Sequence, residues 1–393
     1  MMIRNPVFIL FVLLGIEWAV LSAARHPRAR KYFRFLPGVF WIYFLPMVVS
    51  SAGWIDAKSP LYGWVMTYGL PASLFLLLLG VDLKAVARLG RTALLMFLFG
   101  SLGIMIGTVV SFSLFRPMVG DAFWSGFGAL SASWTGGSAN MAAVKEAIGA
   151  PDEVYLPMVV VDTLVPYVWM GILVIGAKWQ AVFDRWIRAD QAVIENIRQR
   201  ICGPGPNGAR EVSLNGQNGL IVLLLASCVS LGLKQISSAL PVVEGMISTF
   251  TWTIILVSAV GLVGSLTPLR RLEEMGSTKI GYFLLYFVLT TIGAKASVSC
   301  LGTSLILIAA GFVVVAVHAV ILMGAARWLK APFMLVATAS QANIGGVASA
   351  PVVAEIYQPG LASIGLLMAV FGNVIGTYLG IICGQICRLI TLN

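Results

Sequence analysis

Residues 131–149 read SASWTGGSANMAAVKEAIG, and residues 337–357 read ATASQANIGGVASAPVVAEIY. Each stretch has a glycine pair in its middle, at 136–137 and at 345–346, flanked by hydroxyl and amide side chains. Adjacent glycines weaken a helix by roughly 1 kcal/mol each relative to alanine. Irregular backbone at membrane depth is tolerated only where protein or a watery cavity covers it. The two stretches therefore predict two broken helices around a polar site inside a membrane domain.

Composition supports the membrane domain. The chain has 393 residues, of which 59% are hydrophobic and 11% are charged, whereas an ordinary soluble domain is about 25% charged. These values exclude a soluble globular protein, a disordered chain and a dedicated nucleic-acid binder. Apolar runs of spanning length predict an all-α polytopic membrane protein with about twelve transmembrane helices. The runs lie at 6–24, 36–55, 61–81, 92–115, 122–149, 152–177, 219–236, 247–267, 280–297, 302–323, 332–357 and 360–386.

The two halves of the chain resemble each other, which indicates an internal duplication. A shift of 209 positions places the first glycine pair on the second and Glu146 on Glu355, and a shift of 211 places Asp162 on Asn373. We take 1–177 and 219–393 as the two repeats. The polar stretch 178–218 between them predicts a linker with one amphipathic helix.

The basic loops of the two halves are out of phase. Lysine and arginine mark cytoplasmic loops, and in the second half they lie one loop later than in the first. This pattern predicts inverted-topology repeats. Six crossings per half would return the chain to its starting side, so inverted repeats would require the linker to cross once. The linker shows no apolar span, and the exact number of crossings therefore stays open. The basic residues of these loops are Arg25, Arg28, Arg30, Lys31, Arg34, Lys84, Arg88 and Arg91 in the first half and Arg270, Arg271, Lys279, Arg327 and Lys330 in the second.

Interrupted helices at matching places in two inverted halves point to the binding site of a transporter. Close packing of helices through small residues is the alternative, but it explains less well two glycine pairs with amide side chains beside them. The residues predicted to bind solute are Thr135, Gly136, Gly137, Ser138, Asn140, Ser340, Gln341, Asn343, Gly345 and Gly346.

Asp162 lies near the middle of the run 152–177, where an isolated carboxylate costs about 3 kcal/mol. It needs a partner, a cation or a proton, and a carboxylate suits the exchange of a proton for Na⁺. Its repeat counterpart Asn373 offers a carbonyl oxygen without charge. Lys295 is a candidate counter-charge for Asp162, or else it extends to the membrane surface. Glu17, Glu146, Glu355 and His318 are predicted to be structural or interfacial.

Signatures of enzymes and metal sites are missing. The sequence has no nucleotide-binding loop and no HExxH motif, and its two histidines and five cysteines show no metal-ligand spacing. We expect no enzyme activity and no cofactor, with Na⁺ at Asp162 as the one candidate ion.

The motifs SWTGGSANMAAVKEA and SQANIGGVASAPVVAE, followed by FGNVIGTYLG, resemble those of the YjcL-like family of uncharacterised membrane proteins. That family is placed in the superfamily of cation:proton antiporters and organic-anion symporters. The resemblance implies panel domains at 6–55 and 219–267 and core domains at 61–177 and 280–386, in which two broken helices cross and the core moves as an elevator. It also implies that Asp162 binds the ion. Thr163 stands where electrogenic antiporters have a second aspartate, which puts two-proton stoichiometry in doubt.

The sequence therefore predicts a multi-pass protein of the cell inner membrane that carries a small, anionic organic solute (an organic acid, amino acid or small peptide), coupled to Na⁺ or H⁺. Its predicted ion-binding residues are Asp162, Thr163 and Asn373. A Na⁺/H⁺ antiporter without organic substrate is the alternative, and a membrane enzyme or receptor is the alternative of another class. The expected partners are the solute, the cation and the lipid bilayer, without nucleic acid, and a homodimer stays open.

Overall fold

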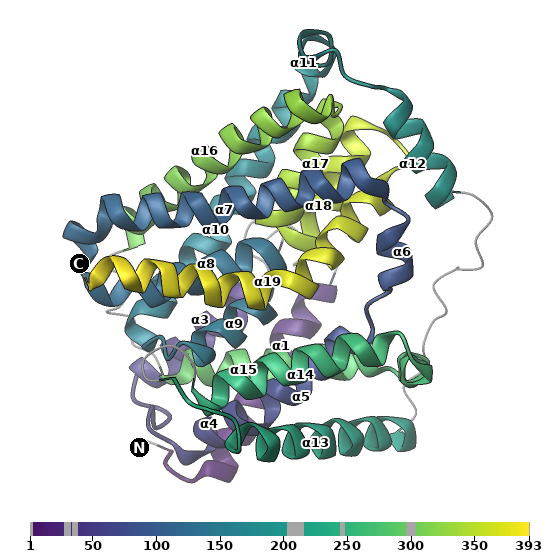
Figure 1. The fold of residues 1–393 in the computed structure, drawn as a ribbon. Coiled ribbons are helices and arrows are strands. Elements are labelled where there is room, and N and C mark those ends of the chain that lie inside the picture. Colours follow the sequence, from purple (N-terminus) through teal and green to yellow (C-terminus); the bar gives the residue numbers. More distant parts are fainter. Residues whose placement is uncertain are drawn as a thin grey trace. The chain divides into compact units, whose positions relative to one another are not determined.

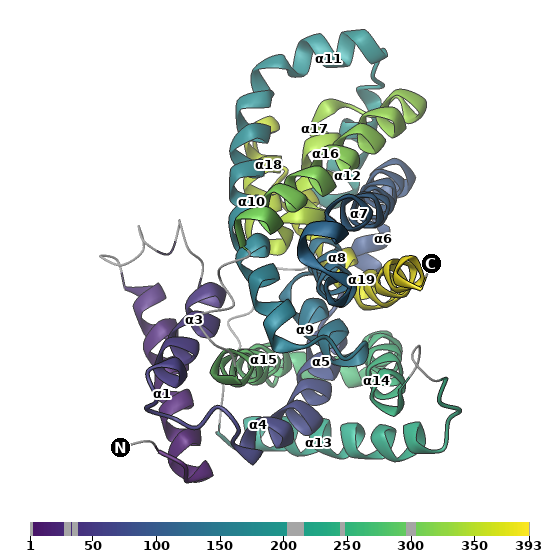
Figure 2. The ribbon, with the colours of Figure 1, turned by 90° about the vertical axis from the view of Figure 1, so that its left-hand side faces the viewer.

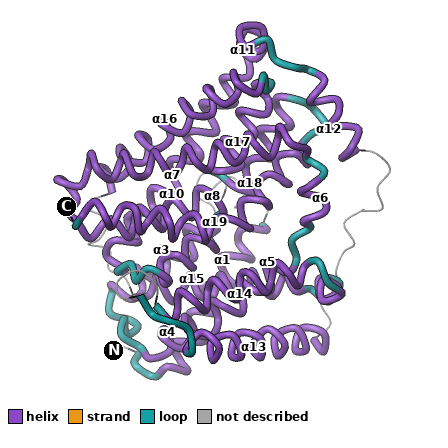
Figure 3. Tube along the Cα trace, viewed as in Figure 1, coloured by secondary structure: helices purple, strands orange, loops and turns teal. Residues whose placement is uncertain are grey.

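The computed structural model describes residues 3–26, 33, 38–202, 216–243, 248–295 and 304–392. Within these ranges the chain is helical and contains no strand (Figure 3). Parts of the first basic loop and of the predicted linker lie outside the described residues. The helices are α1 (Pro6–Arg25), α3 (Gly38–Ser51), α4 (Pro60–Trp64), α5 (Leu70–Leu79), α6 (Leu83–Ala87), α7 (Gly90–Val119), α8 (Trp124–Gly136), α9 (Ser138–Ala147), α10 (Asp152–Gly176), α11 (Gln180–Ile187), α12 (Ala192–Cys202), α13 (Gly216–Ser238), α14 (Thr249–Ser265), α15 (Ser277–Lys295), α16 (Ser304–Leu329), α17 (Phe333–Ile344), α18 (Gly346–Tyr357) and α19 (Ala362–Thr391).

Where the structure describes the chain, every apolar run predicted from the sequence overlaps a helix or consecutive helices. In the described part of the chain, eight helical segments are long and apolar enough to cross a membrane. Three shorter apolar helices lie at 40–51, 249–265 and 346–357. The chain is therefore a polytopic helical membrane protein, while twelve spans in two inverted repeats stay a prediction.

The chain forms two compact units, and each unit combines segments from both halves of the sequence. The first unit consists of Met1–Val81, Lys145–Thr163 and Val212–Leu305. The second consists of Asp82–Val144, Leu164–Glu211 and Ile306–Asn393. The long helix α10 contributes its first part to the first unit and its remainder to the second. The division into panel and core domains has other bounds than these two units, and it stays a prediction.

In the first unit, α15 packs against α3 and α5, and α14 packs against α5. Helix α1 lies beside α3 (Figure 2). One face of α1 buries Ile9, Leu13 and Glu17, whereas Phe11 and Trp18 on the other face are 65% and 72% exposed. Large apolar side chains exposed along a helix of spanning length are suited to lipid.

In the second unit, α19 lies along α8 (Figure 1). The contact uses Gly372, Gly376 and Gly380, which recur every four residues and so share one face of α19. A Cβ on Gly372 would collide with the Thr135 carbonyl oxygen, and one on Gly376 would lie 2.7 Å from Gly136 Cα. Glycine at these positions lets the two helix backbones touch, as small residues do between membrane helices.

The described part of the predicted linker up to residue 202 packs onto the second unit. It contains two amphipathic helices, α11 and α12, where the sequence predicted one, because Arg188 adopts a left-handed conformation with φ 55° and ends α11. Phe183, Ile187 and Ile194 join the buried core of the second unit. The Asp190 N–H donates to the Lys330 carbonyl at 2.9 Å, so the segment is fixed close to the start of α17.

Asp184 of α11 caps α17, and we expect Asp184→Ala to cost about 1 kcal/mol of folding free energy. Its Oδ1 atom accepts a hydrogen bond from the first N–H of α17, that of Phe333, at 2.8 Å. No side chain of Pro332, the residue before the helix, replaces this bond. Thermal unfolding in detergent measures the loss. Asp184→Asn keeps an acceptor oxygen and is the control, and an equal loss in both variants would show that the cap is not the cause.

Candidate functional site

The first break, between α8 and α9, lies at Gly137, whose φ is 83° and ψ is −179°. This conformation is essentially restricted to glycine. The Gly137 N–H donates to the Ser133 carbonyl at 2.6 Å and closes α8. Asn140 Nδ2 then donates to the Gly136 carbonyl at 2.5 Å. The carbonyl left over at the helix end is thus satisfied by a side chain beyond the break.

Helix α19 supplies two polar side chains to the first break. The Thr377 hydroxyl donates to Asn140 Oδ1 at 2.5 Å. A Cβ on Gly137 would lie 3.8 Å from Asn373 Oδ1, so Asn373 faces the break. The structure thus brings together three of the residues predicted from the sequence: Gly137, Asn140 and Asn373.

The second break, between α17 and α18, lies at Gly345 and Gly346, and Gly346 has φ 60°. Gln341 Nε2 donates across the break to Ser349 Oγ at 2.7 Å and to the Pro166 carbonyl of α10 at 3.3 Å. Both polar segments are therefore divided into two helices at their glycine pairs, as the sequence predicts. In each case an amide side chain bridges the interruption.

Two more of the predicted residues on α17 hydrogen-bond to neighbouring helices. Asn343 Oδ1 accepts from the Ser101 hydroxyl at 2.8 Å, and its Nδ2 donates to the Ala339 carbonyl at 2.9 Å. Ser340 Oγ lies 2.9 Å from His318 Nε2 and accepts from Trp169 Nε1 at 2.8 Å. The predicted Ser138 is the first residue of α9 and is partly exposed.

Some buried polar atoms near the breaks have no hydrogen-bond partner. Among the described residues these include Trp134 Nε1 and Thr135 Oγ1 of α8 and Thr338 Oγ1 and Gln341 Oε1 of α17. All four side chains are at most 1% exposed. Buried polar groups in proteins are otherwise nearly always hydrogen-bonded, so each of these atoms leaves a hydrogen bond unmade. Helices α8 and α17 contact each other within the second unit.

Asp162 and Thr163 belong to the first unit. Asp162 interacts electrostatically with Tyr43 and Tyr155, whose hydroxyl groups are hydrogen-bonded to each other at 2.8 Å. Thr163 donates its hydroxyl proton to the Val159 carbonyl of its own helix at 2.8 Å. Asp162 thus interacts with two phenol groups that sequence reasoning did not single out.

A network of four charged side chains lies in the first unit, where α9 ends and α10 begins. Lys145 Nζ is 2.7 Å from Glu146 Oε1 and 2.8 Å from Asp152 Oδ1. Lys295 Nζ is 3.1 Å from Asp152 Oδ2. The role of Lys295 as counter-charge for Asp162 stays a prediction. Asp152 was missed, although its position shares a helix face with 155 and 162 by spacing.

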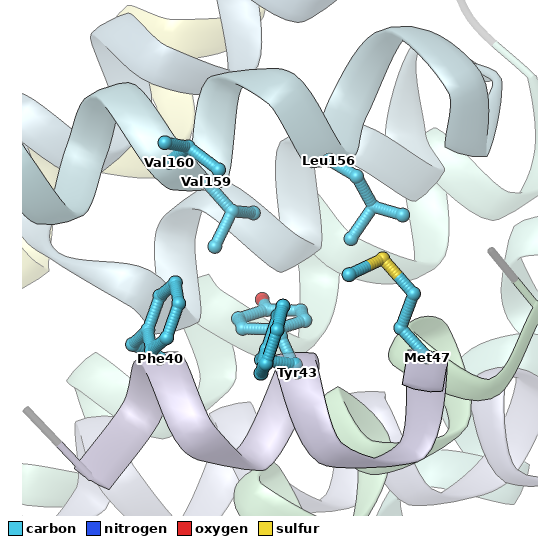
Figure 4. A pocket seen from close by; sticks show the side chains of 7 residues that line it. Phe40, Tyr43, Met47, Leu156, Val159 and Val160 are labelled. Carbon is cyan, nitrogen blue, oxygen red and sulfur yellow. The ribbon is translucent and has the colours of Figure 1, made fainter. Parts of the chain in front are cut away.

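A small pocket lies between α3 and the first part of α10 (Figure 4). Tyr43 carries the one hydroxyl group among the side chains that line it, and the others are apolar. An apolar pocket offers a polar solute no hydrogen bonds, so we do not assign the solute to it. The lining residues are Phe40, Tyr43, Phe44, Met47, Leu156, Val159 and Val160.

Comparison with known proteins places the chain. A family model described as "Protein of unknown function (DUF819)" matches residues 9–390. The chain is also similar to the "Uncharacterized membrane protein YjcL" of Bacillus subtilis (strain 168), with 25% identity over 391 residues and 96% of each chain covered. Both matches run through the two glycine breaks and through Asp162. The family match covers nearly the whole sequence, and the chain therefore belongs to the DUF819 family.

Proposed function

We propose that this protein is a secondary transporter that moves a small, anionic organic solute across the cell inner membrane together with Na⁺ or H⁺. One observation carries the proposal: buried polar atoms without a partner among the described residues lie on α8 and α17, the two helices that end at glycine breaks. A ligand site combines an apolar lining with a few convergent polar groups. Unpartnered atoms at broken membrane helices fit this description.

Three of the four atoms can donate a hydrogen bond to an anion, whereas Gln341 Oε1 only accepts. Trp134 Nε1 can only donate a hydrogen bond, and the hydroxyls of Thr135 and Thr338 can donate one. Helices α8 and α17 contain no charged residue, so no carboxylate on them would repel a negatively charged solute. The N-terminus of α18 adds the positive end of a helix dipole at the second break.

Alternating access would follow the pattern that the resemblance implies. In that proposal, the panel segments 6–55 and 219–267 stay fixed, and the core segments 61–177 and 280–386 carry the solute as an elevator. The solute would bind at the two breaks, through the residues predicted there. Inverted repeats suit such a mechanism because they present equivalent arrangements to the two sides of the membrane.

Asp162 would bind the coupling ion. A carboxylate that interacts electrostatically with Tyr43 and Tyr155 offers oxygen ligands to Na⁺ or a place for a proton. The same arrangement would suffice for a Na⁺/H⁺ antiporter without organic substrate. An antiporter without organic substrate leaves the unpartnered atoms of α8 and α17 without a ligand, and for that reason we prefer the symporter.

The decisive experiment is thermal unfolding of the purified protein with Na⁺, K⁺ or choline at constant ionic strength and at several pH values, followed by a panel of carboxylic and amino acids. A ligand that binds only the folded state at one hundred times its Kd adds about 2.7 kcal/mol of stability. We expect a shift with Na⁺ or pH that grows with one class of acid. A shift with the cation alone would instead support the antiporter.

Asp162→Asn should abolish the shift caused by the ion while the protein stays folded, because asparagine removes the charge and keeps the shape. Asp121→Asn is the matched control, since Asp121 pairs with Arg116 at the surface and is 62% exposed. It should respond to the ion as the natural protein does. A full ion response in Asp162→Asn would exclude Asp162 as the ion site.

A further inference from the structure

His318 of α16 is completely buried and lies next to a residue of the proposed solute site. Its Nδ1 atom is 2.8 Å from the Gly100 carbonyl oxygen of α7, and its Nε2 atom is 2.9 Å from Ser340 Oγ of α17. Gly103 makes the approach possible, because a Cβ there would lie 3.0 Å from His318 Cα. From the sequence we expected a structural or interfacial histidine. The structure shows a ring held at both nitrogens between two helices.

The partners of the ring fix its tautomer. A carbonyl oxygen only accepts hydrogen bonds, so the proton of the neutral ring is on Nδ1 and Nε2 is an acceptor. Ser340 must then donate its hydroxyl proton to Nε2, and its oxygen accepts from Trp169 Nε1 at 2.8 Å. The result is a one-way chain of donors from Trp169 through Ser340 and His318 to Gly100.

Ser340 has one hydroxyl proton, which it cannot give to the imidazole and to a solute at the same time. When Nε2 binds a second proton it becomes a donor, and Ser340 Oγ then accepts from both His318 and Trp169. The hydroxyl proton stays on Ser340 but no longer bonds to the imidazole, so it can point toward another acceptor. A carboxylate bound at the α17 break is such an acceptor.

The three helices that hold the ring, α7, α16 and α17, contain no acidic residue. Helix α7 carries Arg91 and Arg116, α16 carries Arg327, and α17 carries no ionisable residue. The part of α10 that belongs to the second unit carries Tyr167. A buried imidazolium without an anion nearby is costly. A bound carboxylate would supply the missing negative charge.

We propose that His318 takes up a proton together with the anionic solute, so that proton and solute bind to the second unit as a neutral pair. This inference rests on the proposed function and deepens it, because it adds a proton that binds together with the solute, separate from the ion at Asp162. The proton comes from water on the side where the solute enters, binds Nε2, and leaves to water on the side where the solute is released. Coupling between the two ligands is reciprocal: each raises the affinity for the other by the same factor.

The test uses the small number of histidines. The chain has two, His26 and His318, and His26→Gln leaves one imidazole to observe. With ¹⁵N-labelled histidine, NMR of this variant in detergent should show a neutral ring protonated on Nδ1 between about pH 6 and pH 8. Acetate, L-lactate, succinate and L-glutamate are the probes. The acid that raises the melting temperature should convert the ring to imidazolium at a pH at which the ligand-free ring is neutral.

Binding measurements give the second readout. If one proton binds with each solute, the Kd of that acid should rise about tenfold per pH unit over the same range. In His318→Gln the Kd should not depend on pH. The NMR experiment keeps the natural ring, so it decides the question even if His318→Gln does not fold.

Each outcome bears on a different part of the proposal. An acid that binds while the ring stays neutral at saturation would overturn the role of His318 and leave a transporter of that acid intact. A ligand-free ring protonated on Nε2 would also overturn it. If none of the acids binds, both the proposal of an anionic solute and the proposal for His318 are overturned. An ion response that depends on Asp162 would then favour the antiporter.

Discussion

Replacing Lys145 with methionine is expected to lower the free energy of unfolding by about 3–5 kcal/mol, the usual effect of removing one partner of a buried ion pair. The Lys145 side chain is 3% exposed, and its ammonium group lies between Glu146 and Asp152. Methionine has nearly the same length and flexibility but no charge. The substitution therefore leaves two carboxylates, 21% and 15% exposed, near each other without the cation between them.

Lys295→Met is the matched control. Lys295 contacts the same carboxylate of Asp152, but it is 32% exposed and its nitrogen lies 3.1 Å away. A partly exposed pair contributes about 0–1 kcal/mol. Thermal unfolding of both variants in the same detergent provides the comparison. Equal losses would mean that burial of Lys145 does not decide the effect, and neutralising Asp152 in the Lys145→Met background should recover part of the loss.

The second large effect is expected for Gly137→Ala. The φ and ψ angles of Gly137 belong to a region essentially restricted to glycine, and another residue held there is strained by about 1–3 kcal/mol. Crowding is not the cause, since the closest atom to the new Cβ is Asn373 Oδ1 at 3.8 Å. Alanine relieves the strain by continuing the helix of α8 into α9. The break would then be lost, and we expect binding of the solute to be lost with it.

Gly171→Ala provides the control for Gly137→Ala. Gly171 lies within α10, has no positive φ, and a Cβ there would meet no atom within 4 Å. Alanine in a helix is favoured over glycine by about 1 kcal/mol, so this variant should be as stable as the natural protein or more stable. The readouts are the melting temperature and its response to the acid that binds. A Gly137→Ala protein with natural stability and binding would show that the break is dispensable.

The positions of the helices were predictable because they depend on local sequence. A run of apolar residues of spanning length must form a helix in lipid, whatever its neighbours are. The breaks were predictable for a similar reason, since a glycine pair with polar neighbours interrupts a helix by its own conformational preference. Gly137 and Gly346, both with positive φ, are at the expected places.

Side-chain partners were not predictable, because they depend on how the helices pack. The sequence predicts a structural or interfacial role for His318, but not that its ring contacts Gly100 and Ser340, which are 218 and 22 residues away in the sequence. No local pattern links these residues. The ion pair of Lys295 with Asp152 has the same origin. The second helix of the linker was missed for another reason: the left-handed turn at Arg188 has no glycine to announce it.

The direct contact of α8 with α19 has a mechanical consequence. Three glycines leave no layer of side chains between these helices that could change rotamer and absorb a displacement. The two helices should thus behave as one stiff body, and any movement of the Gly137 break must carry the last helix of the chain with it. A spectroscopic probe close to the exposed residue Leu392 would then report on movement at the centre of the solute site without touching it.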